Sequence, residues 1–398
     1  MSPQLPLTKR PQETSKLVPA APDELWRAIF RFATITTKSS PLYDVDFSPF
    51  RESWLDRHSF DDSLKVKKSI VLVCRHWKAL GVEFLYEHME VHTLSKLLRK
   101  GEENDRSVGR FVRRLVLPYR PFEYEGGGSS RFTEILKWCP KVEILVQPAW
   151  LGGSEDNTGF WRDDPRVDFT LALTSLLTNV KRIDWCTVGN ETFHDIHCHR
   201  LAGVLRATTN LRYLSLRYKV DPFPGPSSIT LPSLLTLRLH GEIGIYGLNM
   251  PNLAHIIVNN IGVASDYCAF KRVGPSLRVI QLAGYGDGYQ FDVLRLAPSL
   301  RELCCSVRRE TLVMLGCLHE SIHTVRLYCV ANPDAPAIAG FRKKSVVLYH
   351  KTALPSLERV ILHGDWSSFS KHPEFRLFRM RVLDRGCILE YASGRLVD

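Results

Sequence analysis

The stretch TNLRYLSLRY at residues 209–218 sets a template that recurs along most of the chain. Clear further copies are LPSLLTLRLHG (231–241), MPNLAHIIVNN (250–260), GPSLRVIQLAG (274–284), APSLRELCCSV (297–307) and LPSLERVILHG (354–364). Weaker copies are RFVRRLVLP (110–118), PKVEILVQP (140–148), TNVKRIDWC (178–186) and ESIHTVRLYCV (320–330). Each copy reads apolar-x-x-apolar-x-apolar, and Pro-Ser, Pro-Asn or Thr-Asn usually precedes the first of these three apolar anchors.

The spacing of the copies favours stacked strands. Between Leu211 and Ile322 the first anchors follow one another at intervals of 23, 19, 24, 23 and 22 residues. The last two anchors of a copy lie two positions apart, so on a strand they share one face and the residue between them lies on the other. One such strand cannot bury its apolar face alone, whereas stacked copies can. The longer intervals hold helical patterns such as FTEILKWC (132–139) and FTLALTSLLT (169–178).

This pattern resembles the leucine-rich-repeat family in a degenerate form. The Asn or Cys that usually follows the third anchor in that family is mostly absent here. The resemblance implies a curved α/β solenoid of about ten degenerate repeats over residues 92–398. The alternative is an ordinary α/β domain with several similar strands.

The N-terminal part has a different character. Residues 1–20 are polar and proline-rich and are interpreted as a flexible tail. A helix is predicted from Asp23 to about Thr34, because acidic residues in its first turn suit the helix dipole and Leu25, Ile29 and Phe32 form an apolar stripe. Residues 36–62 show no period and are interpreted as an insert, after which 63–89 reads as helical.

These two helical stretches resemble the F-box, over roughly residues 22–91. The matching residues are Pro22-Asp23-Glu24-Leu25 with Ile29, and later Val73-Cys74-Arg75-His76-Trp77. Ala21 stands where the family has the Leu of its Leu-Pro pair, and the insert makes the gap between the halves longer than usual. The combination with the following repeats, and the segment EFLYEHMEV (83–91), is similar to the expanded F-box families of mushroom-forming fungi.

The resemblance implies a substrate-recognition subunit of a Skp–cullin–F-box ubiquitin ligase, which carries out no bond chemistry itself and needs no cofactor. The F-box would bind the Skp-type adaptor, which links to a cullin–RING core, and the repeats would bind target proteins. By match to the motif, adaptor contacts are assigned to Pro22, Leu25, Ile29, Val73, Cys74 and Trp77. For each of these residues the alternative is packing between the helices of the module.

Target proteins are expected on the strand residues that face away from the anchors. These positions hold six arginines, including Arg114, and two acidic residues, Asp184 and Glu302. Planar guanidinium groups suit carboxylates and phosphates, so an acidic or phosphorylated segment is the expected ligand. The candidate residues are Arg182, Tyr213, Arg217, Arg238, His240, His255, Arg326, Tyr328 and Arg359. The alternative is a solvated, mildly basic surface.

The composition and the motifs of the chain narrow the range of possible functions. The chain has 398 residues and a formal net charge of +11, of which residues 1–110 carry +3 (18 basic, 15 acidic) and residues 111–398 carry +8 (35 basic, 27 acidic). This excess suggests acidic partners. No signal peptide or membrane span is recognised, so an intracellular, cytoplasmic or nuclear, location is expected. No catalytic or metal-binding motif is found. The alternatives are a leucine-rich-repeat scaffold without a ligase role and a nucleic-acid-binding protein.

Overall fold

The structure is a computed structural model that describes residues 21–34, 45–50, 57–91, 93–94, 105–117, 134–147, 174–186, 194–217, 228–240, 245, 247–258, 270–282, 293–307, 319–329, 341 and 345–397. The described helices are α1 (Asp23–Thr34), α3 (Arg57–Val73), α4 (Arg75–Tyr86), α8 (His194–Ala207), α10 (Val293–Leu296) and α12 (Pro373–Asp384), with short 3-10 helices η1 (Asp105–Phe111), η4 (Gly274–Ser276) and η6 (Phe369–Lys371). The fold is mixed α/β, as the sequence predicts.

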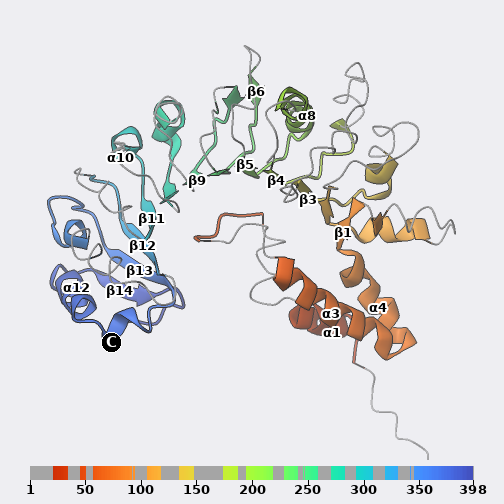
Figure 1. Cartoon of the computed structure of the whole chain (residues 1–398), viewed down its shortest axis with the longest axis horizontal. Coiled ribbons are helices and arrows are strands. Elements are labelled where there is room, and N and C mark those ends of the chain that lie inside the picture. The colour runs from red at the N-terminus through yellow and green to blue at the C-terminus, as the bar shows by residue number, and fades with distance from the viewer. Residues whose placement is uncertain are drawn as a thin grey trace, which may run out of the picture.

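One parallel sheet of twelve strands dominates the molecule. Its strands are β1 (His88–Glu90), β2 (Arg114–Val116), β3 (Ile144–Gln147), β4 (Arg182–Cys186), β5 (Tyr213–Arg217), β7 (Thr236–His240), β9 (His255–Val258), β10 (Val279–Leu282), β11 (Glu302–Ser306), β12 (Thr324–Cys329), β13 (Arg359–Gly364) and β14 (Ile388–Tyr391). They follow one another in chain order along an open arc, with α8 and α10 on its outer side (Figure 1). A separate two-stranded ladder pairs β6 (Ile229–Thr230) with β8 (Leu248–Asn249).

The template determines where the strands begin. In all ten copies the strand begins one residue before the second anchor, as at Tyr213 before Leu214 in β5. The anchors of neighbouring strands are in register, for example Leu214 with Leu237. Both of these side chains are fully buried, and they belong to a core that runs from Met89 to Val397. Parallel strands in register therefore bury one continuous apolar face.

A tight turn precedes most first anchors and explains the Pro-Ser and Pro-Asn pairs. The amide of Leu300 donates to the carbonyl of Ala297, and the amide of Leu253 donates to that of Met250. The residues in between occupy the two central positions of a β-turn, where proline is favoured first because its φ is already suitable. Each pair thus forms the turn that ends one unit and leads into the strand of the next.

The second turn residue also links neighbouring units. Three of these side chains donate to the preceding unit's first turn residue, Asn179 to the Pro140 carbonyl, Asn210 to Thr178 and Asn252 to Pro232. The N···O distances are 2.9, 2.8 and 2.7 Å. Ser276 and Ser321 hold the same place and also donate to the preceding unit. A ladder of polar side chains thus runs along the turns that precede the first anchors. Most copies nevertheless lack the Asn or Cys that would follow the third anchor.

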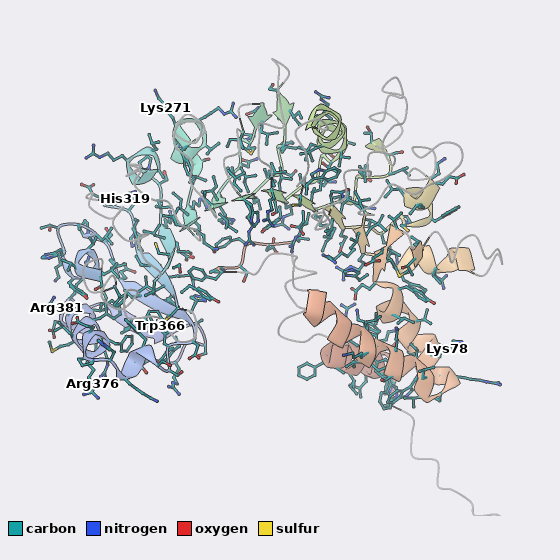
Figure 2. All side chains as sticks on the ribbon, viewed as in Figure 1. Lys78, Lys271, His319, Trp366, Arg376 and Arg381 are labelled. Carbon is teal, nitrogen blue, oxygen red and sulfur yellow. The ribbon has the colours of Figure 1, made fainter. Side chains whose placement is uncertain are left out.

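An aromatic cluster closes the C-terminal end of the sheet. Trp366, labelled in Figure 2, lies at this end of the sheet and packs edge-to-face on Phe341 and Phe369. Its indole N–H donates to the carbonyl of His363 at 2.8 Å. Phe375 and Phe378 on α12 complete the cluster and are buried. Edge-to-face pairs add about 0.5–1.5 kcal/mol beyond area burial, so this end is internally well packed.

Helices α1, α3 and α4 form the helical module, which lies near the N-terminal end of the sheet (Figure 1). Its core consists of Phe30, Ile70, Leu80 and Phe84. The predicted helix Asp23–Thr34 is confirmed with the same bounds. Helix α3 begins at Arg57, inside the segment interpreted as an insert.

Two further boundaries differ from expectation. Strand β1 falls in the stretch assigned to the helical module and pairs with β2. Strand β14 was not anticipated, because its sequence ILEY lacks the spaced anchors of the template. The residues of the expected tail, 1–20, lie outside the described part of the chain.

Candidate functional site

The side of the sheet that faces the inside of the arc carries the candidate substrate residues, and we call it the inner face. Its members are the strand residues that alternate with the buried anchors. In register, one row includes Tyr213, Thr236 and His255, and the next includes Ser215, Arg238 and Ile257. Because neighbouring parallel strands lie about 4.8 Å apart, each inner-face side chain touches those on the adjacent strands.

Two of the candidate residues are largely closed off by internal contacts. Arg182 is only 2% exposed and its Nε donates to Asp184 at 2.9 Å. Its guanidinium also lies 4.8 Å from the ring centroid of Tyr213, which is itself 1% exposed. Breaking such a buried ion pair leaves an uncompensated charge. Arg182 and Tyr213 therefore stabilise the inner face and offer little surface to a ligand.

Two other arginines bind carboxylates of the chain itself. Arg326 reaches both carboxylate oxygens of Glu302, with its Nε 2.7 Å from Oε1, and its Nη1 lies 3.3 Å from the ring of His363. Arg359 forms an ion pair with Glu390. Burial and the charge of Arg326 lower the pKa of His363 to about 4. This end of the inner face thus has its cations matched by acids and carries a neutral imidazole at neutral pH.

Arg217, Arg238 and His240 form a cluster on β5 and β7. Arg217 and His240 are in register, and Arg238 lies one row away. Arg217 is exposed whereas Arg238 is buried. Burial, with Arg238 and Arg217 nearby, lowers the pKa of His240 to about 3. The structure therefore brings these three candidates together, with Arg217 as the side chain most open to solvent.

The remaining candidates, His255 and Tyr328, contact another part of the same chain. Residues Val45–Phe50 cross the hollow of the arc beside the inner face (Figure 1). The ring of Phe47 lies 4.8 Å from that of His255, and the ring of Phe50 stacks on Tyr328 at 5.1 Å. The amide of Phe50 donates to Gln281 Oε1 at 2.7 Å. Sequence reasoning missed this contact, because it placed the segment in an insert without a periodic pattern.

A second basic row was also missed. The residue directly after the first anchor is basic in five copies, the first of which has Arg113. The side chains in the other four copies, Lys181, Arg212, Arg278 and Arg301, line a groove of ≈ 820 Å³ that runs along the turns. The signal is present in the sequence as a fixed register position, but this position precedes the strand and so lies outside the strand residues expected to bind the target. Arg212 extends from this row to Asp46 of the crossing segment, at 3.0 Å.

The candidate adaptor residues divide into outward and inward groups. Leu25, Ile29 and Val73 are 50%, 44% and 60% exposed, and Pro22 is exposed as well. Trp77 instead packs against the module core, with ring centroids 5.0 Å from Trp26 and 4.9 Å from Phe30. For Trp77, packing between the helices is therefore what the structure shows.

Cys74 marks the break between α3 and α4. Its backbone is extended, and its sulfur accepts a hydrogen bond from the amide of Trp77 at 3.4 Å. The thiol is exposed and acts as the N-cap of α4. Cys74 thus serves as a capping residue where the chain turns from one helix to the next.

The described part of the chain contains no cluster of three or more His, Cys, Asp or Glu side chains that could hold a metal ion. Among the described residues, no helix is both long and apolar enough to cross a membrane. The chain matches no protein-family model and no curated protein. The inner face and the exposed apolar side chains of the helical module are the two surfaces that bear on function.

Proposed function

We propose that this chain is the substrate-recognition subunit of a Skp–cullin–F-box ubiquitin ligase. In this proposal the helical module is an F-box and the twelve-stranded sheet is a degenerate leucine-rich-repeat solenoid. The module binds the Skp-type adaptor and the inner face binds the target. The chain itself performs no bond chemistry and acts by raising the local concentration of the target near the conjugating enzyme.

The apolar stripe on the outside of α1 carries this proposal. Trp26 and Phe30 pack inward on α1, whereas Leu25, Ile29 and Phe32 recur at i, i+4 and i+7 on another side and are 50%, 44% and 86% exposed. An amphipathic surface helix normally exposes polar residues on its outer side. A second apolar stripe therefore indicates that another protein covers this side.

The junction between α3 and α4 exposes further apolar side chains. Leu72 and Val73 are 81% and 60% exposed at the end of α3. Full burial of such a side chain contributes about 1.5–3 kcal/mol, so covering several half-exposed ones supplies the scale of energy that a stable interface needs. Leu25, Ile29 and Val73 are residues that the F-box resemblance assigns to the adaptor, so two independent arguments select the same side chains.

The arrangement of the sheet supports the leucine-rich-repeat part of the proposal. Ten strands follow the same template, run parallel in chain order and present buried anchors in register. The turn-based ladder of Asn and Ser side chains joins successive units. Stacked units of this kind form extended binding surfaces on their inner side.

The test is co-purification of the full chain with a Skp-type adaptor and a cullin. Ile29→Asp places a charge in the proposed interface and should lower adaptor affinity by at least about tenfold, as expected for a central interface residue. The matched control is Leu383→Asp on α12, because Leu383 is also 44% exposed but lies at the other end of the chain. Equal adaptor binding by wild type and Ile29→Asp would refute the proposed interface.

A chain that binds no adaptor at all, in any variant, would favour the scaffold alternative. The two outcomes are separable, because the scaffold alternative predicts target binding without a cullin in the complex.

A further inference from the structure

The segment Val45–Phe50, of sequence VDFSPF, occupies the inner face as a bound peptide would. It touches the sheet through side chains at both of its ends, and its Phe50 amide donates a hydrogen bond to the side chain of Gln281. The contacts join residues far apart in the sequence, since Phe50 and Gln281 are separated by 231 positions. The segment therefore shows what kind of chain this surface accommodates.

Each residue of the segment that contacts the sheet meets a matching group. Val45 packs on an apolar cluster of Val116, Ile144 and Val146 at β2 and β3. Asp46 forms an ion pair with Arg212, which belongs to the basic row along the turns. Along the segment, an apolar, an acidic and an aromatic side chain thus meet apolar, basic and aromatic groups of the sheet, in that order.

The aromatic contacts are the most specific. Phe47 lies on the imidazole of His255, whose Nδ1 is 3.0 Å from the hydroxyl of Thr236. Phe50 lies between Tyr328 and His363, with both ring centroids 5.1 Å away. Arg326 and Glu302 pair beside this position. Two aromatic positions, three residues apart, are therefore provided by strands β9, β12 and β13.

The segment is held in a strained conformation. Phe50 has φ 55°, in the left-handed region that a bulky residue rarely adopts. The hydrogen bond to Gln281 and the stacking on Tyr328 keep it there. A separate peptide that presents the same rings without this strain can compete, although it lacks the advantage of being on the same chain.

We propose that the inner face is a binding site for extended protein segments in which an acidic residue is followed by two aromatic residues, and that Val45–Phe50 is its internal occupant. A target segment of this chemistry displaces the internal one. The inference rests on the proposed function only in taking the bound protein to be a ligase target. It departs from the expectation of a mainly arginine-based site, because Arg326 and Arg359 already bind Glu302 and Glu390.

The first experiment measures fluorescence anisotropy of a labelled, end-capped VDFSPF peptide with the full chain. Phe47→Ala/Phe50→Ala removes the internal rings, so this variant should bind the peptide about tenfold more tightly than wild type does. Adding Tyr328→Ala to that variant should abolish the gain. Lys271→Ala is the control, because Lys271 lies on the outer side of the arc (Figure 2). A peptide with both phenylalanines replaced by alanine should not bind.

A second measurement needs no variant. Hydrogen exchange of the Phe50 amide in the wild-type chain should speed up on saturation with the peptide, because displacement breaks the bond to Gln281. Unchanged exchange, equal binding of the alanine peptide, or binding unaffected by Tyr328→Ala would each overturn the inference.

The same samples separate this inference from the proposed function. Phe47→Ala/Phe50→Ala should leave adaptor binding as in wild type. If the adaptor binds but the peptide does not, the inference alone fails. If the peptide binds as expected but wild type captures no adaptor, the ligase role alone fails.

Discussion

Among the described residues, the helical module has a core of four buried hydrophobic side chains, whereas the core of the sheet continues from Met89 to Val397. In the module, Leu25 and Ile29 remain about half exposed on the same helix that buries Phe30. In the sheet, the anchors are buried and even polar residues such as Arg182 and Asp184 lie inside. The sheet thus buries its apolar anchors within the chain, while the module leaves an apolar stripe exposed, which is where the proposal places another protein.

The largest expected effect contrasts one leucine from each region. Leu237 is fully buried in β7, so Leu237→Ala should lower the free energy of unfolding by about 3–4 kcal/mol through lost contacts and a residual cavity. Leu25 is 50% exposed, and Leu25→Ala should change it by no more than about 0.5 kcal/mol. Calorimetric or denaturant-induced unfolding of the two variants measures this difference.

For adaptor binding, the order of the two effects is expected to be the opposite of that for stability. In its presence, Leu25→Ala should weaken binding, while Leu237→Ala should leave the affinity of the folded fraction unchanged. If both leucines cost the same stability in the isolated chain, the module does not differ from the sheet in the way described.

The strands of the sheet, including β7 with Leu237, were predictable because their signal is local. In each template copy three anchors within six residues determine which face is buried, and every one of the ten copies became a strand. The helix Asp23–Thr34 was predictable for the same reason. Strands β1 and β14 were missed, because the ends of the sheet pair on one side only and HME and ILEY have no template.

The candidate site was only partly predictable. Alternation placed Arg182, Arg238 and Arg326 on the inner face, but could not show that Asp184 and Glu302 pair with two of them. The crossing of Val45–Phe50 depends on contacts across more than 200 residues, such as Phe50 with Gln281, which leave no periodic trace in one sequence. The exposed stripe of α1 was visible as a pattern, but its outward direction required the packing of Trp26 and Phe30.

A smaller effect concerns His240, a polar side chain that the sheet partly buries. The pKa of His240 is lowered to about 3 in the folded chain, against about 6.5 in an unfolded one. The unfolded state therefore binds more protons between these values, so stability is fully present above pH 6.5 and is lost as the pH falls toward 3. At pH 5 this loss is about 2 kcal/mol.

The comparison variant for this effect is His240→Gln. Its stability should fall less than that of wild type between pH 7 and pH 5, as measured by urea unfolding at each pH. Asn252→Ala is the control, because it removes no titratable group and should keep the wild-type pH dependence. Parallel pH profiles for wild type and His240→Gln would show that His240 is not buried as described.

The smallest effect tests how successive units of the sheet are joined. Asn252 donates from one turn to the Pro232 carbonyl of the preceding unit at an exposed position. Asn252→Ala should therefore lower the free energy of unfolding by only about 0.5–1 kcal/mol, the usual net contribution of a hydrogen bond. Asn252→Ser should recover part of it, because Ser276 and Ser321 serve as donors at the same place in their own units. Since the module has no such ladder among its described residues, the loss should appear in the sheet transition and leave adaptor binding unchanged. A loss that Ser fails to recover would mean that Asn252 stabilises its turn locally and does not couple one unit to the next.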